Sequence, residues 1–161
     1  ATEEDSDEDN GPAPEIQAAK KLEEELAAAE TAAAEAAEAT ANARQNLVNY
    51  ALQFVGGPYR AGGNDPRTGV DCSGFVRYVM QHGAGISMNR SSSGSQATQG
   101  HAVNSSQMQP GDLLFYSGGS GINHVAMYIG DGKIVHASTY ATGIKISKWN
   151  YRNPVKIVSM F

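Results

Sequence analysis

Five short runs in the C-terminal third of the chain are rich in β-branched, aliphatic and aromatic residues, with turn-forming residues between them. Runs of this length and composition predict β-strands. The predicted strands cover residues 112–116, 124–129, 133–138, 144–149 and 155–160. The second and third are joined through Gly130-Asp131-Gly132, which is typical of a β-hairpin turn. We therefore expect an antiparallel sheet in this part of the chain.

An apolar stretch upstream of these strands predicts a short helix. We expect it to begin at Cys72, to run to about His82 and to be capped by Gly83. A glycine-rich loop, residues 56–63, leads into it, and residues 84–110 are mostly polar. Because helices come first and consecutive strands follow, the pattern predicts an α+β fold.

The N-terminal part of the chain has a different pattern. Residues 15–45 are rich in alanine and glutamate and contain no glycine or proline, which favours a long helix. Apolar residues recur at alternating spacings of four and three from Leu22 onward, as in a heptad repeat, but most of them are alanine. Since alanine buries little area, two interpretations stay open: a coiled-coil tail through which the chain self-associates, or a single solvated helix.

Composition divides the chain into three parts. Residues 1–14 are acidic and poor in apolar residues, which predicts disorder; residues 15–46 form the Ala/Glu-rich helix, and residues 47–161 form a globular domain. Residues 1–45 hold 13 acidic and three basic residues, a net charge of −10, whereas residues 46–161 hold four acidic and nine basic residues, a net charge of +5. A basic body attracts polyanions, but no nucleic-acid motif is present, so we expect no nucleic-acid partner.

Two features bear on where the protein resides. No apolar run approaches the roughly 20 residues that span a bilayer, so no membrane span is expected. The chain opens with acidic residues instead of the basic and then apolar stretch of a signal peptide. We expect either a cytoplasmic protein or a mature or truncated piece of a secreted one, and a start at Ala1 instead of Met favours the second.

Cys72 is the only cysteine of the chain, and it lies where the glycine-rich loop enters the predicted helix. The unpaired backbone N–H groups and the positive end of the helix dipole at this position favour a thiolate over a thiol. A thiolate is the nucleophile of cysteine catalysis. On this pattern alone, an inert buried cysteine remains the alternative.

A catalytic cysteine needs a base, and two histidines fit that role. His124 and His136 stand on the two strands of the predicted hairpin, and a pairing centred on Gly130 would put them directly opposite each other, with Cβ atoms about 5 Å apart. This predicts Cys72 as nucleophile, His124 as general base and then acid, and His136 as the residue that orients His124. Two partly exposed histidines are the alternative. No close-spaced set of metal ligands is present, so no metal is expected.

Two groups near Cys72 are candidates for stabilising an oxyanion. One is the backbone N–H of Cys72 itself, at the start of the helix. The other is the hydroxyl of Tyr59, because the glycines around it let the backbone approach closely. A core aromatic is an equally good interpretation of Tyr59.

Five sequence blocks, in one order, resemble the NlpC/P60 family of cell-wall cysteine peptidases over about residues 47–161. The blocks are GPYRAGG at 57–63, DCSGFV at 71–76, PGDLLF at 110–115, NHVAMYIG at 123–130 and HAS at 136–138. The resemblance implies a papain-like fold in which the nucleophile helix packs on an antiparallel sheet, here preceded by an alanine-rich helical segment. It also implies a secreted enzyme of the bacterial cell wall. Such an enzyme cleaves peptidoglycan stem peptides, most often between γ-D-glutamate and the following diamino acid, without a cofactor.

The same resemblance implies roles for single residues. Cys72 matches the nucleophile, His124 the base and His136 the third polar residue. The positions that match the substrate groove are Tyr59, Asp71 and Ser73, and those that match a loop bordering it are Arg90, Ser91 and Ser92. An acidic residue beside the thiol can hold a substrate ammonium, although the alternative role of Asp71 is to cap the helix.

Two other functions remain to be weighed. An amidase of the related CHAP type also pairs a helix-start cysteine with a strand histidine, but its third residue is more often a carboxylate or asparagine. The presence of His136 and of the Asp-Cys-Ser-Gly block favours the NlpC/P60 interpretation. A non-catalytic module that binds the cell wall is the alternative from a different class, and the intact Cys72, His124 and His136 argue against it.

Overall fold

The computed structural model describes residues 13–89 and 92–161. The chain divides into two compact units, residues 1–40 and residues 41–161. Helix α2 (Pro14–Leu52) contributes to both: its first turns belong to the first unit, and its last turns open the second. The predicted long N-terminal helix is therefore confirmed.

The first unit consists of the exposed part of α2. Pro14 is its first residue, where the fixed φ and the missing N–H are tolerated. Residues 15–42 are all exposed within the chain, including the seam residues Leu22 and Leu26. The acidic segment predicted to be disordered falls mainly on residues 1–12, which lie outside the described residues. Among the helices of the described ranges, none is both long enough and apolar enough to cross a membrane.

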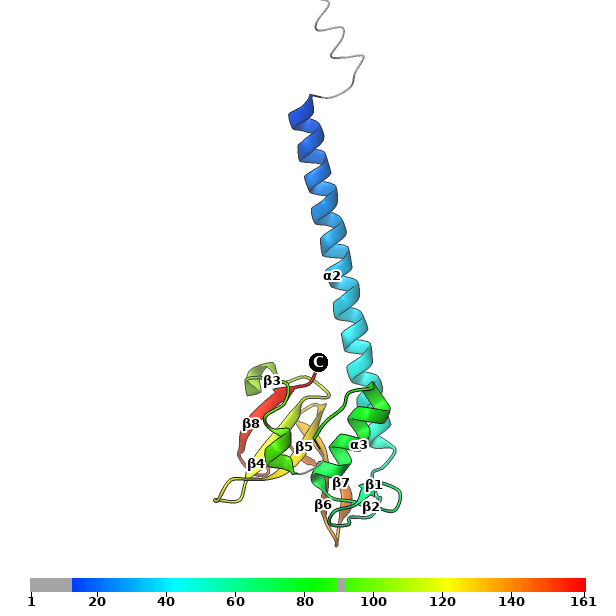
Figure 1. Ribbon diagram of the computed structural model, residues 1–161, viewed down its shortest axis with the longest axis vertical. Coiled ribbons are helices and arrows are strands. Elements are labelled where there is room, and N and C mark those ends of the chain that lie inside the picture. The colour runs from blue at the N-terminus through cyan, green and yellow to red at the C-terminus, as the bar shows by residue number, and fades with distance from the viewer. Residues whose placement is uncertain (1–12, 90–91) are drawn as a thin grey trace, which may run out of the picture. The chain divides into compact units, whose positions relative to one another are not determined.

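The second unit is built on a six-stranded antiparallel sheet with the strand order β3-β8-β4-β5-β6-β7 (Figure 1). Its strands are β3 (His101–Ala102), β4 (Leu113–Ser117), β5 (Ile122–Gly130), β6 (Lys133–Thr139), β7 (Gly143–Lys148) and β8 (Pro154–Ser159). All five predicted strands are present, with ends within two residues of the prediction. The short edge strand β3 is an addition.

Smaller elements surround this sheet. They are the two-stranded sheet of β1 (Asn64–Asp65) and β2 (Gly69–Val70), the helices α3 (Cys72–Ala84) and α4 (Ser93–Gln96), and the 3-10 turn η1 (Ser105–Gln107). Helix α3 lies across β5 and β6. The predicted α+β fold, with the cysteine-bearing helix packed on an antiparallel sheet, is confirmed.

Helix α3 ends later than predicted. Its left-handed cap is Gly85, with φ of 67°, and not Gly83. Gly83 lies inside the helix, where a Cβ would stand 3.0 Å from side-chain atoms of Leu47 and Tyr50. The glycine at this position is therefore explained by the close approach of α2 to α3, and the prediction of Gly83 as the cap is wrong.

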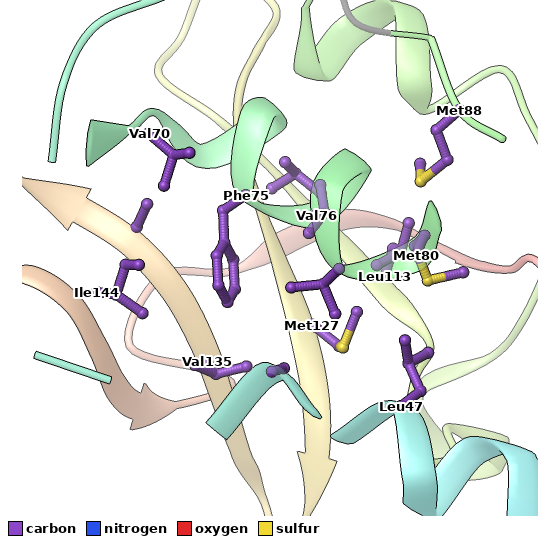
Figure 2. Close-up of a cluster of buried hydrophobic side chains, with 14 of the residues drawn as sticks. Leu47, Val70, Phe75, Val76, Met80, Met88, Leu113, Met127, Val135 and Ile144 are labelled. Atoms are coloured by element: carbon purple, nitrogen blue, oxygen red, sulfur yellow. The ribbon is translucent and has the colours of Figure 1, made fainter. Parts of the chain in front are cut away.

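The main hydrophobic core lies between α3 and one face of the sheet, with the last turns of α2 closing it (Figure 2). Its buried side chains include Leu47 and Ala51 from α2, Phe75, Val76, Val79 and Met80 from α3, and Leu113, Phe115, Val125, Met127 and Val135 from the sheet. A smaller cluster on the other face contains Leu114, Tyr116, Ala126, Ile134 and Ile157. The alternation along β5 thus points Val125 and Met127 to one face and Ala126 to the other, as its pattern predicts.

The β5–β6 hairpin differs from the predicted pairing. A pairing centred on Gly130 would put His124 opposite His136, but Met127 pairs with Val135, two residues away from its predicted partner. The turn consists of Asp131 and Gly132, since Gly130 pairs with Lys133, and this displaces the pairing by three residues. An extra residue in β5 between Tyr128 and Gly130 moves the register back by one, which leaves a displacement of two. An even shift keeps the same side chains on the same face. The two histidines are therefore diagonal neighbours on one face, and the prediction that they are directly opposed is wrong.

A buried ion pair ties the last turns of α2 to the start of β4. Nη1 of Arg44 lies 2.7 Å from Oδ1 of Asp112, and the exposed fractions of these residues are 9% and 1%. Arg44 also donates to the carbonyl of Pro110 and to the hydroxyl of Ser159. The backbone N–H of Gln109 donates to the other oxygen of the Asp112 carboxylate. The acidic residue of the Pro-Gly-Asp block thus has a structural role.

Candidate active site

The site begins at the N-terminus of α3, where Cys72 is the first helical residue. Asp71 caps the helix: its Oδ1 accepts from the backbone N–H of Gly74 at 2.8 Å. Its Oδ2 accepts from the backbone N–H of Gly62 at 3.0 Å. One carboxylate thus holds the helix start and the glycine-rich loop together, and the capping role considered for Asp71 is the one that the geometry shows.

The thiol of Cys72 is mostly buried between the helix start and β5. Burial raises its pKa, and the nearby charge of Asp71 adds to this. The backbone N–H groups of Val125 and Ser73 act in the opposite direction, which places the sulfur beside the residue that follows His124 in β5. The backbone N–H groups at the helix start thus favour the thiolate, as expected, but burial is the larger effect, so the pKa is raised overall and the resting group is a thiol.

His124 and His136 form a hydrogen-bonded chain across the sheet. Nε2 of His124 lies 2.7 Å from Nδ1 of His136, and Nε2 of His136 lies 2.9 Å from the hydroxyl oxygen of Ser147 in β7. With His124 protonated on Nε2, it donates to His136, which in turn donates to Ser147. Nδ1 of His124 is then the nitrogen with a lone pair for a proton from a nucleophile.

Burial keeps both imidazoles neutral. The exposed fractions of His124 and His136 are 8% and 1%. Burial lowers the pKa of His124 to about 4, with a contribution from the charge of Arg152. It lowers the pKa of His136 to about 3, with contributions from His124 and Lys145. Near pH 7 the pair can therefore accept a proton, as a general base must.

Tyr151, in the turn between β7 and β8, covers the histidine chain and was missed by sequence reasoning. Its ring centroid lies 5.3 Å from that of His136 and 5.3 Å from that of Tyr116. Burial raises the pKa of Tyr151, and the neighbouring Arg152 acts in the opposite direction. A residue between two predicted strands has no periodicity that could have identified it.

Arg152 connects this turn to β4 and β5. Its Nη2 donates to the carbonyl of Ser117 at 2.8 Å and to the side-chain oxygen of Asn123 at 2.9 Å. Its guanidinium lies 5.7 Å from the ring centroid of Tyr116. The turn that carries Tyr151 is thereby held over the imidazoles.

Two tyrosines border the glycine-rich loop. The rings of Tyr59 and Tyr140 meet edge to face with centroids 4.9 Å apart. The backbone N–H of Ala61 donates to the Tyr140 hydroxyl at 3.1 Å. Tyr59 is half-buried, and burial together with the charges of Cys72 and Asp71 raises its pKa, so its phenol stays protonated and can donate a hydrogen bond. Tyr140, in the turn after β6, is a second residue that sequence reasoning missed.

The remaining predicted groove residues are held by structural contacts. The backbone carbonyl of Ser73 accepts from Nε2 of the buried Gln96 at 2.9 Å. Ser92 is the N-cap of α4, and its hydroxyl accepts from the backbone N–H of Ser95 at 3.0 Å. Arg90 and Ser91 lie outside the described residues. In the part of the chain that the structure describes, no group of three or more His, Cys, Asp or Glu side chains could hold a metal ion.

Comparison with known sequences agrees with these features. The model of the NlpC/P60 family matches residues 56–157. A probable endopeptidase p60 of Listeria innocua is 44% identical over 91 residues, 56% of this chain and 19% of the relative. A gamma-DL-glutamyl hydrolase of Bacillus subtilis is 39% identical over 105 residues, 65% of this chain and 24% of the relative. The chain thus spans about a quarter or less of the length of these relatives.

Solved structures give the same result. The NlpC/p60 domain of the peptidoglycan hydrolase SagA is 35% identical, has a TM-score of 0.66, and is matched over 73% of this chain and 98% of that domain. The peptidoglycan hydrolase RipB of Mycobacterium tuberculosis is 30% identical with a TM-score of 0.66, matched over 76% of this chain and 67% of RipB.

Proposed function

The chain belongs to the NlpC/P60 family, and on this premise we propose that it is a peptidoglycan hydrolase. It acts as a cysteine endopeptidase on stem peptides, at the bond between γ-D-glutamate and the following diamino acid. The observation that carries the proposal is the His124–His136–Ser147 chain, which begins one residue before Val125, whose backbone N–H lowers the pKa of the Cys72 thiol. The similarity to a gamma-DL-glutamyl hydrolase supports the choice of bond.

The resting site holds a neutral thiol and neutral imidazoles, so proton transfer accompanies attack. As the Cys72 sulfur attacks the carbonyl carbon, Nδ1 of His124 takes the thiol proton. The Nε2–H of His124 remains bonded to His136, which keeps the ring oriented while it is charged. Because His136 is neutral, it supports the imidazolium less strongly than a carboxylate would.

The tetrahedral intermediate then collapses to products. The backbone N–H of Cys72 and the hydroxyl of Tyr59 stabilise its oxyanion. His124 gives the proton to the leaving amine as the C–N bond breaks, which leaves a thioester on Cys72. Water, deprotonated by His124, hydrolyses the thioester and restores the thiol.

The substrate groove is proposed to follow the glycine-rich loop. Tyr59, Asp71 and Ser73 border the thiol, and the negative charge of Asp71 favours a substrate ammonium. A carboxylate has about four lone pairs, so a capping hydrogen bond is compatible with a further donor. A wall-directed activity implies that the protein works outside the cytoplasm of a bacterium, and this localisation is part of the proposal.

The test is digestion of purified peptidoglycan and of soluble muropeptides by the wild type and by Cys72→Ala, with products identified by mass spectrometry. Fragments cut at the γ-D-glutamyl bond that vanish in the variant are expected, and they identify the diamino acid. Fragments cut at the lactyl–L-alanine bond would instead support an amidase. Tight binding of both proteins without any products would support a non-catalytic wall-binding module.

Self-association through α2 is a separate part of the proposal. The heptad residues Leu22 and Leu26 are 57% and 55% exposed within one chain, so a second helix has an apolar stripe to cover. Sedimentation equilibrium of the wild type and of a variant with both leucines changed to serine distinguishes the cases. A monomeric wild type would show that α2 is a single helix.

A further inference from the structure

A hollow lies beside the second core cluster, to which its lining residues Trp149 and Ile157 belong. Its volume is about 420 Å³. The loop before η1, the β7–β8 connection and β8 itself line it, with Val103, Asn104, Trp149, Asn153, Val155 and Lys156 among the lining residues. None of these residues is part of the proposed peptidase machinery, so the hollow has no role yet.

The apolar part of the hollow is rigid. The backbone N–H of Trp149 donates to the carbonyl of Gly132 at 3.0 Å, and its carbonyl accepts from the hydroxyl of Tyr116 at 2.6 Å. Both backbone groups of the tryptophan are therefore fixed, and its half-buried indole packs on the second core cluster. Val155, in β8, also lines the hollow and is 58% exposed. An indole and an aliphatic side chain thus form a preformed apolar surface open to a ligand.

The polar part of the hollow has unused hydrogen-bonding capacity. Asn104 and Asn153 are exposed, and within residues 13–89 and 92–161 neither carboxamide makes a hydrogen bond. Each carboxamide can donate two hydrogen bonds and accept two. Lys156 is exposed as well and forms no ion pair with the described residues. The residues that line the hollow include no acidic side chain.

This combination fits an N-acetylated sugar. A pyranose ring presents an apolar C–H face that packs on an indole, and its hydroxyl and acetamido groups need both donors and acceptors at the rim. We propose that the hollow, hereafter the glycan site, binds the N-acetylated sugars of the glycan strand that carries the stem peptide. The inference rests on the proposed peptidoglycan substrate and adds a second point of attachment to it.

The position of the glycan site supports this assignment. Tyr116 donates to the carbonyl of Trp149, and its ring centroid lies 5.9 Å from that of His124. One residue therefore separates the wall of the glycan site from the proposed base. A strand held on Trp149 keeps its attached peptides near Cys72, which raises their local concentration at the thiol.

The chain offers a direct probe, because Trp149 is its only tryptophan. The full chain with Cys72→Ala, which leaves every bond of the ligand intact, is titrated with the tetrasaccharide of N-acetylglucosamine while tryptophan emission is recorded. We expect a saturable change in emission and matching heat in calorimetry. The variant Asn153→Ala should bind roughly fivefold more weakly or worse, as expected for a lost hydrogen bond. Asn49→Ala, an exposed asparagine of α2 away from the hollow, is the matched control and should bind normally.

Three results would overturn the glycan site. The first is no change in emission and no heat. The second is binding that Asn153→Ala leaves unaltered, since the sugar would then bind elsewhere. The third is an equal emission change with a free stem peptide, which would assign the hollow to peptide. Cleavage of soluble muropeptides is measured separately: an enzyme that cleaves them without binding the tetrasaccharide refutes the glycan site alone. A protein that binds the sugar but cleaves nothing refutes the proposed activity alone.

Discussion

Two buried polar pairs, one at the contact between α2 and the start of β4 and one on β5 and β6, behave in opposite ways. Arg44 and Asp112 carry opposite charges, so each offsets the cost of burying the other, and extra hydrogen bonds satisfy most of their remaining polar atoms. His124 and His136 are two bases, so burial can only favour their neutral forms. Similar burial thus makes one pair a fixed structural link and the other a proton acceptor. The difference arises because Arg44 has a partner of opposite charge, whereas each histidine has another base as its partner.

The largest difference between the roles of the two pairs should appear when the proposed base, His124, is replaced. We expect His124→Asn to lower kcat on soluble muropeptides by about 10²- to 10⁴-fold, because proton transfer to a positioned base is lost. The free energy of unfolding, measured in urea near pH 7, should be nearly unchanged, since asparagine and the neutral histidine are both uncharged polar side chains. A variant that keeps its activity would exclude His124 as the base.

The converse experiment breaks the ion pair. We expect Asp112→Asn to lower the free energy of unfolding by about 3–5 kcal/mol, because Arg44 is left as an uncompensated buried cation. At a temperature where the variant is folded, its kcat should stay within a few-fold of the wild type. The paired variant Arg44→Met with Asp112→Leu, which removes both charges, should recover much of the loss. A change below about 1 kcal/mol in Asp112→Asn would contradict the structural role.

The histidine pair should also make stability depend on pH. A histidine whose pKa is lowered in the folded state binds its proton more readily when unfolded, so its destabilising effect grows as the pH falls below about 6.5. The loss extends from pH 6.5 down to about 4 for His124 and down to about 3 for His136. We expect His136→Asn to reduce this loss by about 3 kcal/mol at pH 4, measured by urea unfolding at each pH. Parallel curves for the two proteins would show that His136 is not the cause.

Much of the fold could be predicted because it depends on local patterns. Alternating residues identify the strands, and the Asp-Cys-Ser-Gly block identifies the helix start. Other features depend on contacts between distant segments. Gly83 and Gly85 both fit a helix cap by sequence, and only the packing of α2 distinguishes them. The extra residue in β5 near Gly130 and the burial of Cys72 likewise depend on the assembled sheet.

Residues of the site that lie in turns were the hardest to predict. Tyr140 and Tyr151 follow strands in irregular segments, where neither spacing nor propensity carries information about the site. Only the folded chain brings Tyr151 against His136. The contribution of such a residue is best tested through the groups that it covers.

Tyr151 should have the smallest effect and the most specific one. Its ring excludes water from His136, so Tyr151→Ala should let the pKa values of the pair rise toward the usual 6.5. The acidic limb of the kcat/KM profile should then move to higher pH by up to about one unit, because the base stays protonated over a wider range. Tyr151→Phe keeps the ring and should leave the limb in place. Tyr140→Ala, a matched loss of a tyrosine that contacts Tyr59 and not the histidines, should also leave it in place. If Tyr151→Phe moves the limb as far as Tyr151→Ala, the phenol hydroxyl, and not exclusion of water by the ring, sets the pKa values of the pair.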